Sequence, residues 1–306
     1  MARLAATTVA ELDAELAELS TRIATTDGIG AQRAELRAAH ELLLRATPAA
    51  ARPPLGALGT LARAIEPLPP RVIDGLAPRP RTVFRLLQAG VPAAAWEVVA
   101  DNATGMVTTT FGAATSSGAA RTDWRLPLLT RIEPPAVFAW LPGFRDPRFG
   151  APDECYDITP LIRPAFALDE AWRDGSRLHL AGSMSLEHLD TSPAETVQLV
   201  ATAGDRELVV PAVRMRRPDL VRGTGSALTR LAWAGWSATV DLRDRRLGGG
   251  EWALSVVLEH DGIRRTSAVA VARTELTRPD VHGLRVGLRR RVTLDPAEKG
   301  WRLLVS

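Results

Sequence analysis

The N-terminal part of the chain carries apolar residues at helical spacing. Between 8 and 24 they recur every three or four residues and share one face of a helix, namely Val9, Leu12, Leu16, Leu19 and Ile23. Thr8 and Glu11 have the spacing of a capping box, in which each side chain satisfies a free backbone N–H at the helix start. We therefore predict an amphipathic helix over 8–24.

A second helical pattern runs from about 31 to 46, after the glycines of 28–30 break the first. Its apolar positions are Leu36, Leu43 and Leu44. Two amphipathic helices joined by a short turn predict an αα-hairpin. Prolines recur through 53–70. A short helix is expected over 81–89, with Gly90 as its C-cap, and another over 93–100.

After residue 101 the sequence pattern changes to alternating apolar and polar positions, which predict strands. The segment 105–155 is ambiguous, with 107–111 and 125–132 as candidate strands and 134–152 as a long loop. Clear alternation follows at Leu178, Leu180, Gly182, Met184 and Leu186, and again at Trp236, Ala238, Val240 and Leu242. Two more strands are expected over 196–203 and 207–215, on either side of Gly204-Asp205.

Two hairpins are predicted near the C-terminus. Asp261-Gly262 is typical of a tight turn between twisted strands, and it places Glu259 opposite Arg264. Apolar residues share the other face of this hairpin, namely Trp252, Leu254, Val256, Leu258, Val269 and Val271. A last hairpin is expected to join 284–294 to 301–305 through an Asp295-Pro296 turn.

These patterns predict an α+β fold, with a helical N-terminal region followed by one or more antiparallel immunoglobulin-like β-sandwich modules. We expect a helical linker or oligomerisation region over 1–100 and a β or loop connection over 101–155. The sandwich is expected over 156–275 and a terminal hairpin over 276–306, with room there for the start of a further module.

Charge is unevenly distributed along the chain. Residues 206–306 hold 19 basic and 11 acidic side chains, a net charge of +8, so residues 1–205 carry −5 of the total of +3. The asymmetry points to an anionic partner for the C-terminal part, or else to an ordinary solvated arginine surface. Cys155 is the only cysteine, so no intrachain disulfide can form. Neither a signal peptide nor a membrane-spanning run is expected, and we predict a cytoplasmic protein, with the inner face of the membrane as an alternative location.

Motifs that carry catalysis are missing from the sequence. No Asp-x-Asp pair is available to hold a divalent cation against a diphosphate, and the glycine clusters at 223–225 and 248–250 read as turns. The five histidines show no metal-ligand spacing, and Cys155 has no activating base beside it in sequence. We expect no catalytic residue, cofactor or metal.

Binding residues are easier to nominate than catalytic ones. Indole rings in loop-like surroundings can stack on flat partners, and arginine forks bind phosphate oxygens. The polymer-binding candidates are Trp140, Trp172, Arg214, Arg216, Arg217, Arg289, Arg290 and Arg291. On a strand, Arg214 and Arg216 would share one face about 7 Å apart, close to the repeat of a polyol phosphate. Aromatic residues do not interleave with these arginines on a strand, so nucleic acid is not an expected partner.

The strand from Trp233 and Trp236 to Leu242, the Tyr156-Asp157-Ile158-Thr159 segment and Leu247-x-x-Gly250-x-Trp252 form a familiar layout. Over about 156–273 it resembles the β-rich module beside bacterial teichoic-acid-type glycosyltransferases and CDP-glycerol glycerophosphotransferases, notably actinobacterial ones. The segment 68–90, LPPRVIDGLAPRPRTVFRLLQAG, resembles the helical linker after the catalytic domain of family 2 glycosyltransferases that decorate wall teichoic acid.

The catalytic domain of those transferases, with its acidic metal-binding motifs, has no counterpart in this chain. The resemblance therefore implies the linker and the C-terminal part, which in that family support oligomerisation and polymer contact. We expect a non-catalytic accessory region in cell-wall biogenesis, stand-alone, truncated or with a separate glycosyltransferase catalytic domain as partner. A homo-oligomer and an anionic glycopolymer are its other expected partners. The alternatives are a glycosyltransferase with an unrecognised active site and a generic interaction scaffold.

Overall fold

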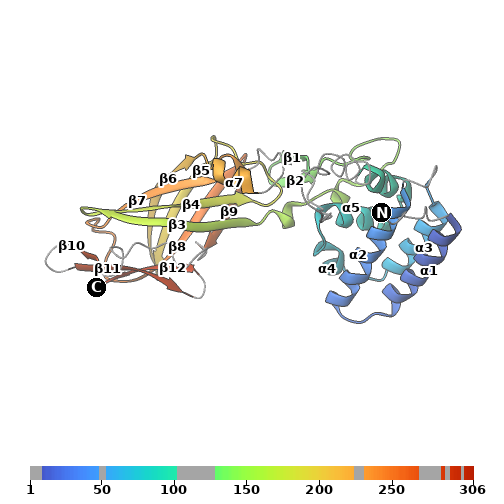
Figure 1. Cartoon of the computed structure of the whole chain (residues 1–306), viewed down its shortest axis with the longest axis horizontal. Coiled ribbons are helices and arrows are strands. Elements are labelled where there is room, and N and C mark those ends of the chain that lie inside the picture. The colour runs from blue at the N-terminus through green and yellow to red at the C-terminus, as the bar shows by residue number, and fades with distance from the viewer. Residues whose placement is uncertain are drawn as a thin grey trace. The chain divides into compact units, whose positions relative to one another are not determined.

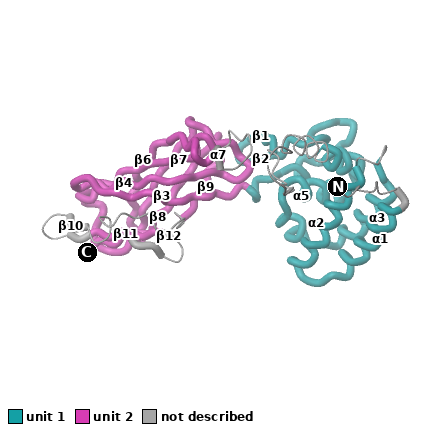
Figure 2. The backbone as a smooth tube through the Cα atoms, viewed as in Figure 1, with its two compact units in different colours: residues 1–161 teal, residues 162–306 magenta. Residues whose placement is uncertain are grey.

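The computed structural model describes residues 9–47, 53–101, 128–223, 231–268, 284–286, 290–297 and 300–306. The chain forms two compact units, residues 1–161 and residues 162–306 (Figure 2). Helices make up most of the described part of the first unit, and antiparallel strands make up most of the second (Figure 1). The predicted α+β fold, helical first and then β-sandwich-like, is confirmed.

Unit 1 opens with the predicted helical hairpin. Helix α1 spans Val9–Thr25 and α2 spans Ile29–Ala46, and Gly28 between them has φ 90°, a left-handed conformation that glycine adopts without steric cost. The α1 stripe is confirmed, because Leu12, Leu16, Leu19 and Ile23 are all buried. Helix α1 packs against α2 and against α3, Leu55–Ile65.

The proline-punctuated stretch forms helices that the sequence analysis did not predict. Helix α3 buries Leu58, Leu61 and Ile65, and α4 spans Pro70–Asp74. Pro70 lies in the first turn of α4, where the missing N–H costs nothing because it would have no intrahelical partner. Helix α5 spans Pro78–Gln88, and residues 92–101 are also helical, as expected for 81–89 and 93–100.

The last part of unit 1 holds a small two-stranded sheet. Strand β1, Thr130–Glu133, pairs with β2, Ala136–Ala139, followed by the 3-10 turns η2, Asp153–Cys155, and η3, Thr159–Leu161. The candidate strand over 125–132 is thus found from Thr130 on, whereas 107–111 lies outside the described residues. The expectation of one long loop over 134–152 is wrong at β2, a strand of four residues directly after Pro134-Pro135, which is too short to give a clear alternating pattern.

The Tyr156–Thr159 segment belongs to unit 1. Tyr156 is fully buried, and its hydroxyl donates to the Pro142 carbonyl oxygen at 3.1 Å. The Arg81 guanidinium of α5 donates to the Asp157 carbonyl oxygen. These hydrogen bonds tie the segment to α5 and to the loop after β2, both in unit 1, which ends at Leu161.

Unit 2 is one curled antiparallel sheet in the order β10-β11-β12-β8-β5-β6-β7-β4-β3, with β9 also paired to β8 (Figure 1). Its strands are β3 Pro164–Asp174, β4 Arg177–Leu186, β5 Thr196–Ala203, β6 Arg206–Met215, β7 Gly235–Asp241, β8 Gly250–His260, β9 Ile263–Ala268, β10 Leu284–Val286, β11 Arg290–Ala297 and β12 Gly300–Val305. A short helix α7, Pro218–Gly223, follows β6. Trp236 and Trp252 are fully buried in the core that this sheet encloses.

The Asp261-Gly262 hairpin forms as predicted. Both turn residues have positive φ, 46° and 79°, as a tight primed turn requires, and Glu259 lies opposite Arg264. Strand β8 buries Trp252, Leu254, Val256 and Leu258. Val269 and Val271 lie outside the described residues.

The last hairpin differs from its prediction. Asp295 and Pro296 lie within β11, opposite Arg302 and Trp301 of β12, so they do not form the turn. The segment 284–294 is divided between β10 and β11, which pair only over Leu284–Val286 and Arg290–Val292. Pro296 is tolerated because it lies beyond the part of β11 that pairs with β10, where a missing N–H breaks no ladder bond on that side.

Candidate functional site

The predicted binding residues lie in both units and do not form one site. Trp140 follows β2 in unit 1, whereas Trp172 and the arginines at 214, 216 and 217 lie in unit 2. Arg290 and Arg291 begin β11, opposite Val286 and Arg285 of β10. Arg289 lies outside the described residues.

Arg214 is not a surface residue. Its side chain is 5% exposed and forms an ion pair with the Glu195 carboxylate, itself 4% exposed. Its Nε also donates to the Ser192 carbonyl oxygen at 3.2 Å. Burial lowers the pKa of Arg214 to about 10. The exposed pair of guanidinium groups expected from Arg214 and Arg216 is therefore not what the structure holds.

The neighbouring arginines are held by other groups. The Arg216 guanidinium lies 5.7 Å from the centre of the Trp233 ring. Arg217 bridges Asp169 of β3 and Asp219 of α7, and the hydrogen bonds that Arg217 donates to the Asp219 carboxylate are the first cause that raises the pKa of Arg217. Of these two arginines, Arg216 is the more exposed and Arg217 mainly fastens α7 to the sheet.

Trp172 lies on the outer face of β3. Its ring stacks on the His179 ring of β4 at 5.1 Å and 11°, and His179 Nδ1 lies 3.0 Å from the Thr239 hydroxyl of β7. The three side chains form a row across adjacent strands, and Trp172 is half-buried. This row is a secondary candidate, because only part of the indole is open to a ligand.

Trp140 is the most exposed aromatic side chain that the structure describes. Its side chain and that of Leu129 are 51% and 66% exposed, and the two residues are neighbours because the Trp140 N–H donates to the Leu129 carbonyl oxygen at 2.8 Å. Alternation along the hairpin explains the arrangement. Val137 and Ala139 point inward and are fully buried, so Phe138 and Trp140 point outward.

Further side chains complete this outer face, which we call the Trp140 face: Leu129, Arg131, Glu133, Phe138, Trp140, Phe144 and Arg145. Phe144 packs edge-on against Trp140 at 5.8 Å and stacks with Phe138 at 5.4 Å. The Arg131 guanidinium lies 5.6 Å from the centre of the Trp140 ring. Arg145 lies over Phe144 at 4.9 Å and over Phe138 at 5.5 Å. Such cation–π and aromatic contacts stabilise the rings in fixed orientations.

Arg145 joins the parts of this face. It donates to both carboxylate oxygens of Glu133, at 2.8 and 2.7 Å, and to Asp153 at 2.8 Å. The residue has φ 54°, a conformation that is uncommon for a side chain other than glycine, asparagine or aspartate. Its hydrogen bond to Glu133 is the first cause that lowers the pKa of Glu133 and raises that of Arg145. These contacts hold the loop after β2 against the hairpin.

Tight packing beneath the face limits how the loop can move. Gly143 has φ 84°, and a Cβ atom there would lie 2.6 Å from the Tyr156 hydroxyl oxygen. Glycine is required on both counts, because a side chain would be strained in this conformation and would displace the tyrosine. The Tyr156 ring in turn contacts Phe144 at 5.3 Å. The exposed rings therefore rest on the buried core of unit 1.

Sequence reasoning found Trp140 but missed Phe138, Phe144, Arg131 and Arg145. One signal was available: Phe138 and Trp140 are two residues apart, and such a pair shares a face on a strand. Arg145 contacts Glu133 of β1 and Asp153 of η2, which lie in separate segments of the chain. Hydrophobic periodicity describes single segments and does not reveal such contacts.

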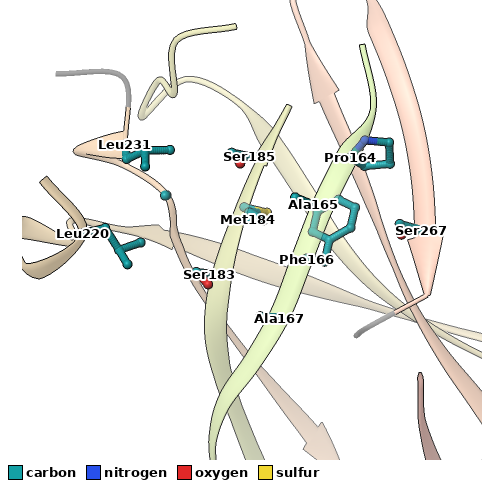
Figure 3. A pocket seen from close by; sticks show the side chains of 11 residues that line it. Pro164, Ala165, Phe166, Ala167, Ser183, Met184, Ser185, Leu220, Leu231 and Ser267 are labelled. Carbon is teal, nitrogen blue, oxygen red and sulfur yellow. The ribbon is translucent and has the colours of Figure 1, made fainter. Parts of the chain in front are cut away.

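A shallow groove of about 380 Å³ lies in unit 2, beside β3 and β4 (Figure 3). Leu220 and Leu231 lie on one side of it and Ser267 of β9 on the other (Figure 3). The described lining residues are apolar apart from three serine hydroxyls, and none is titratable. The lining could hold an apolar group, and its described residues offer no general acid or base.

Within the described part of the chain, no three of the side chains that commonly bind metals come together as a metal site. Cys155 is buried, and burial is the first cause that raises the pKa of its thiol to about 11. None of the helices that could be searched is long and apolar enough to span a bilayer.

Comparison with known proteins gives structural similarity alone. No family model and no curated protein sequence matches the chain. Among solved structures, the fragment 217–571 of Staphylococcus aureus TarS is similar at TM-score 0.47 and 11% identity, over 97% of this chain and 76% of that chain. The crystal structure of S. aureus TarS is similar at TM-score 0.43 and 11% identity, again over 97% of this chain, and this chain spans about half of that one, 48%.

Proposed function

We propose that this chain is a non-catalytic accessory region of a cell-envelope glycopolymer glycosyltransferase, and that it contacts the polymer through the Trp140 face. The observation that carries the proposal is the exposed indole of Trp140, held by Arg131 and Phe144 on a rigid hairpin. An aromatic ring fixed in this way can stack on a flat ligand at little entropic cost. The sequence resemblance to teichoic-acid-type transferases supplies the class of polymer.

Direct binding tests this proposal. The full chain should bind sugar-bearing poly(glycerol phosphate) in a sedimentation or calorimetric assay, and Trp140→Ala should weaken binding at least about fivefold, roughly 1 kcal/mol. Trp172→Ala is the matched control, since it removes the same side chain from unit 2. If the polymer does not bind the full chain, the proposal is wrong; if only Trp172→Ala weakens binding, the contact lies in unit 2.

We also propose that the chain self-associates through the outer face of β6. Val209 and Val213 on this strand are 37% and 66% exposed. Exposed apolar side chains on the face of a sheet are common in interfaces between copies. Sedimentation equilibrium should show association at tens of micromolar protein that Val213→Asp abolishes. A wild-type chain that stays monomeric over this range would contradict this part of the proposal.

A further inference from the structure

The charges of the Trp140 face are balanced once Asp153, which pairs with Arg145 beside the face, is included. Arg131 pairs with Glu133 at 2.6 Å, Glu133 pairs with Arg145 at 2.7 Å, and Arg145 pairs with Asp153 at 2.8 Å. Two guanidinium groups and two carboxylates therefore alternate in one chain of ion pairs. Close by in sequence, Arg148 and Asp146 form a pair of their own at 2.6 Å. The six charges in these ion pairs sum to zero.

This balance bears on which ligand the face can take. A phosphate that approached Arg131 or Arg145 would meet Glu133 and Asp153, which already occupy those arginines. The ion pair of Arg131 uses only its Nε, so a phosphate can reach the other N–H groups of this guanidinium, but it would then lie close to the Glu133 carboxylate, whose like charge offsets the attraction. The face therefore lacks the unpartnered cations that recognise a polyol phosphate.

The open surface of Trp140 suits an uncharged ring. Arg131 lies over the indole and Phe144 against its edge, yet half of the side chain is exposed. The face of an aromatic ring is electron-rich. The C–H bonds on one side of a pyranose carry a slight positive charge and can pack flat against it. Leu129 extends the apolar surface beside the ring.

We infer that the Trp140 face binds a neutral pyranose unit by stacking, and does not bind the phosphates of a polymer backbone. The inference rests on the proposed function for its polymer and adds the chemical class of the group that this site recognises. A single stacked sugar should bind weakly, and many repeats along the polymer should add avidity. The interaction should hardly depend on salt.

Three probes test the inference on the full chain: a neutral oligosaccharide of six pyranose units, a sugar-free poly(glycerol phosphate), and the same polymer bearing pyranose units. Each is titrated at about 0.05 M and about 1 M salt, the latter screening charges beyond about 3 Å. The two sugar-bearing probes should bind with affinities that change less than about twofold with salt. Trp140→Ala should weaken both at least about fivefold, and Trp140→Phe should weaken them less.

A second variant tests the role of charge. Glu133→Gln removes the carboxylate shared by Arg131 and Arg145, so the sugar-free polymer should gain salt-sensitive binding that the wild-type face lacks. Circular dichroism establishes that each variant is folded. Leu55→Ala truncates an exposed apolar side chain of α3, 51% exposed like Trp140, and should leave oligosaccharide binding unchanged. The inference is overturned if the neutral oligosaccharide does not bind, or if Trp140→Ala weakens the sugar-free polymer as much as the sugar-bearing one.

The outcomes separate the inference from the proposed function. Oligosaccharide binding through Trp140 without any binding of the sugar-bearing polymer would leave the inference standing and refute the polymer role. Polymer binding that collapses at high salt and ignores Trp140→Ala would leave the polymer role standing and refute the inference.

Discussion

Arg214 and Glu195 form an ion pair inside unit 2, and both side chains are almost wholly removed from water. His260 joins them, because its Nδ1 lies 2.6 Å from Glu195 Oε1. The three groups link β6, β8 and the segment before β5. Arg214, which the sequence suggested as a ligand-binding residue, is thus paired and buried inside unit 2.

Removing one partner of this pair should destabilise unit 2 severely. Arg214→Ala leaves the Glu195 carboxylate buried without its cation, and the expected loss is about 3–5 kcal/mol in the free energy of unfolding. Chemical denaturation followed by tryptophan fluorescence measures it. Arg216→Ala, at an exposed arginine two residues away, is the matched control and should cost less than about 0.5 kcal/mol. Equal effects of the two variants would contradict the burial argument.

Acid should weaken unit 1 through His40. This side chain is buried, and burial and then the charge of Arg79 lower its pKa from 6.5 to about 4. Below pH 6.5 the unfolded chain binds a proton at this histidine that the folded chain does not, so stability falls with pH until about pH 4. The loss from this group at pH 5 is about 2 kcal/mol. His40→Gln should flatten the pH dependence of stability by that amount between pH 7.5 and pH 5. A profile unchanged by the substitution would refute the assignment.

The Cys155 thiol should react very slowly with thiol reagents while the chain is folded. The residue is 5% exposed, and a thiol pKa of about 11 leaves little thiolate at pH 8. Reaction with Ellman's reagent should be at least about 100-fold slower than in the unfolded chain, from the loss of thiolate alone. The unfolded chain in guanidinium chloride supplies the reference rate. Rapid labelling of the native chain would contradict the buried position.

Two glycine substitutions should act in opposite directions. A Cβ atom at Gly182 of β4 would overlap the Ala167 carbonyl oxygen of β3 and press on the Trp236 ring nitrogen, so Gly182→Ala should destabilise by about 3 kcal/mol. Gly59 lies in the middle of α3 with open space around it, so Gly59→Ala should stabilise by about 0.5–1 kcal/mol. Thermal unfolding of both variants measures the difference.

Periodicity predicted most of unit 2 but missed β3, for a reason that the structure shows. The pairing of β3 with β4 shifts register between Leu168 and Glu170, at a bulge. The buried residues Phe166, Leu168 and Ala171 are consequently spaced by two and then by three. A bulge changes which face later residues occupy, so the alternation that reveals a strand is lost at that point.

The position of Arg214 could have been predicted, since it has the same parity as Leu208, which is buried. Because the two residues are an even number of positions apart on one strand, Arg214 is expected on the same inner face as Leu208. The prediction of an exposed side chain rested only on the charge of arginine. The partner Glu195 lies before β5, outside any strand, so no periodic pattern connects the two. The contacts of Arg145 on the Trp140 face escaped prediction for the same reason, since Glu133 and Asp153 lie in separate segments.

The bond from Arg81 to Asp157 has a consequence for how such proteins can be assembled from parts in evolution. A recombination event that joined new sequence at residue 156 would separate Tyr156 from the loop that it packs against and Asp157 from α5, and would leave a gap in the core of unit 1. A junction between Leu161, the last residue of unit 1, and Pro164, the first of β3, would preserve both cores. The helical unit and the Tyr156–Thr159 segment should therefore be inherited together. Proteins in which this helical unit is joined to a different second domain should retain that segment.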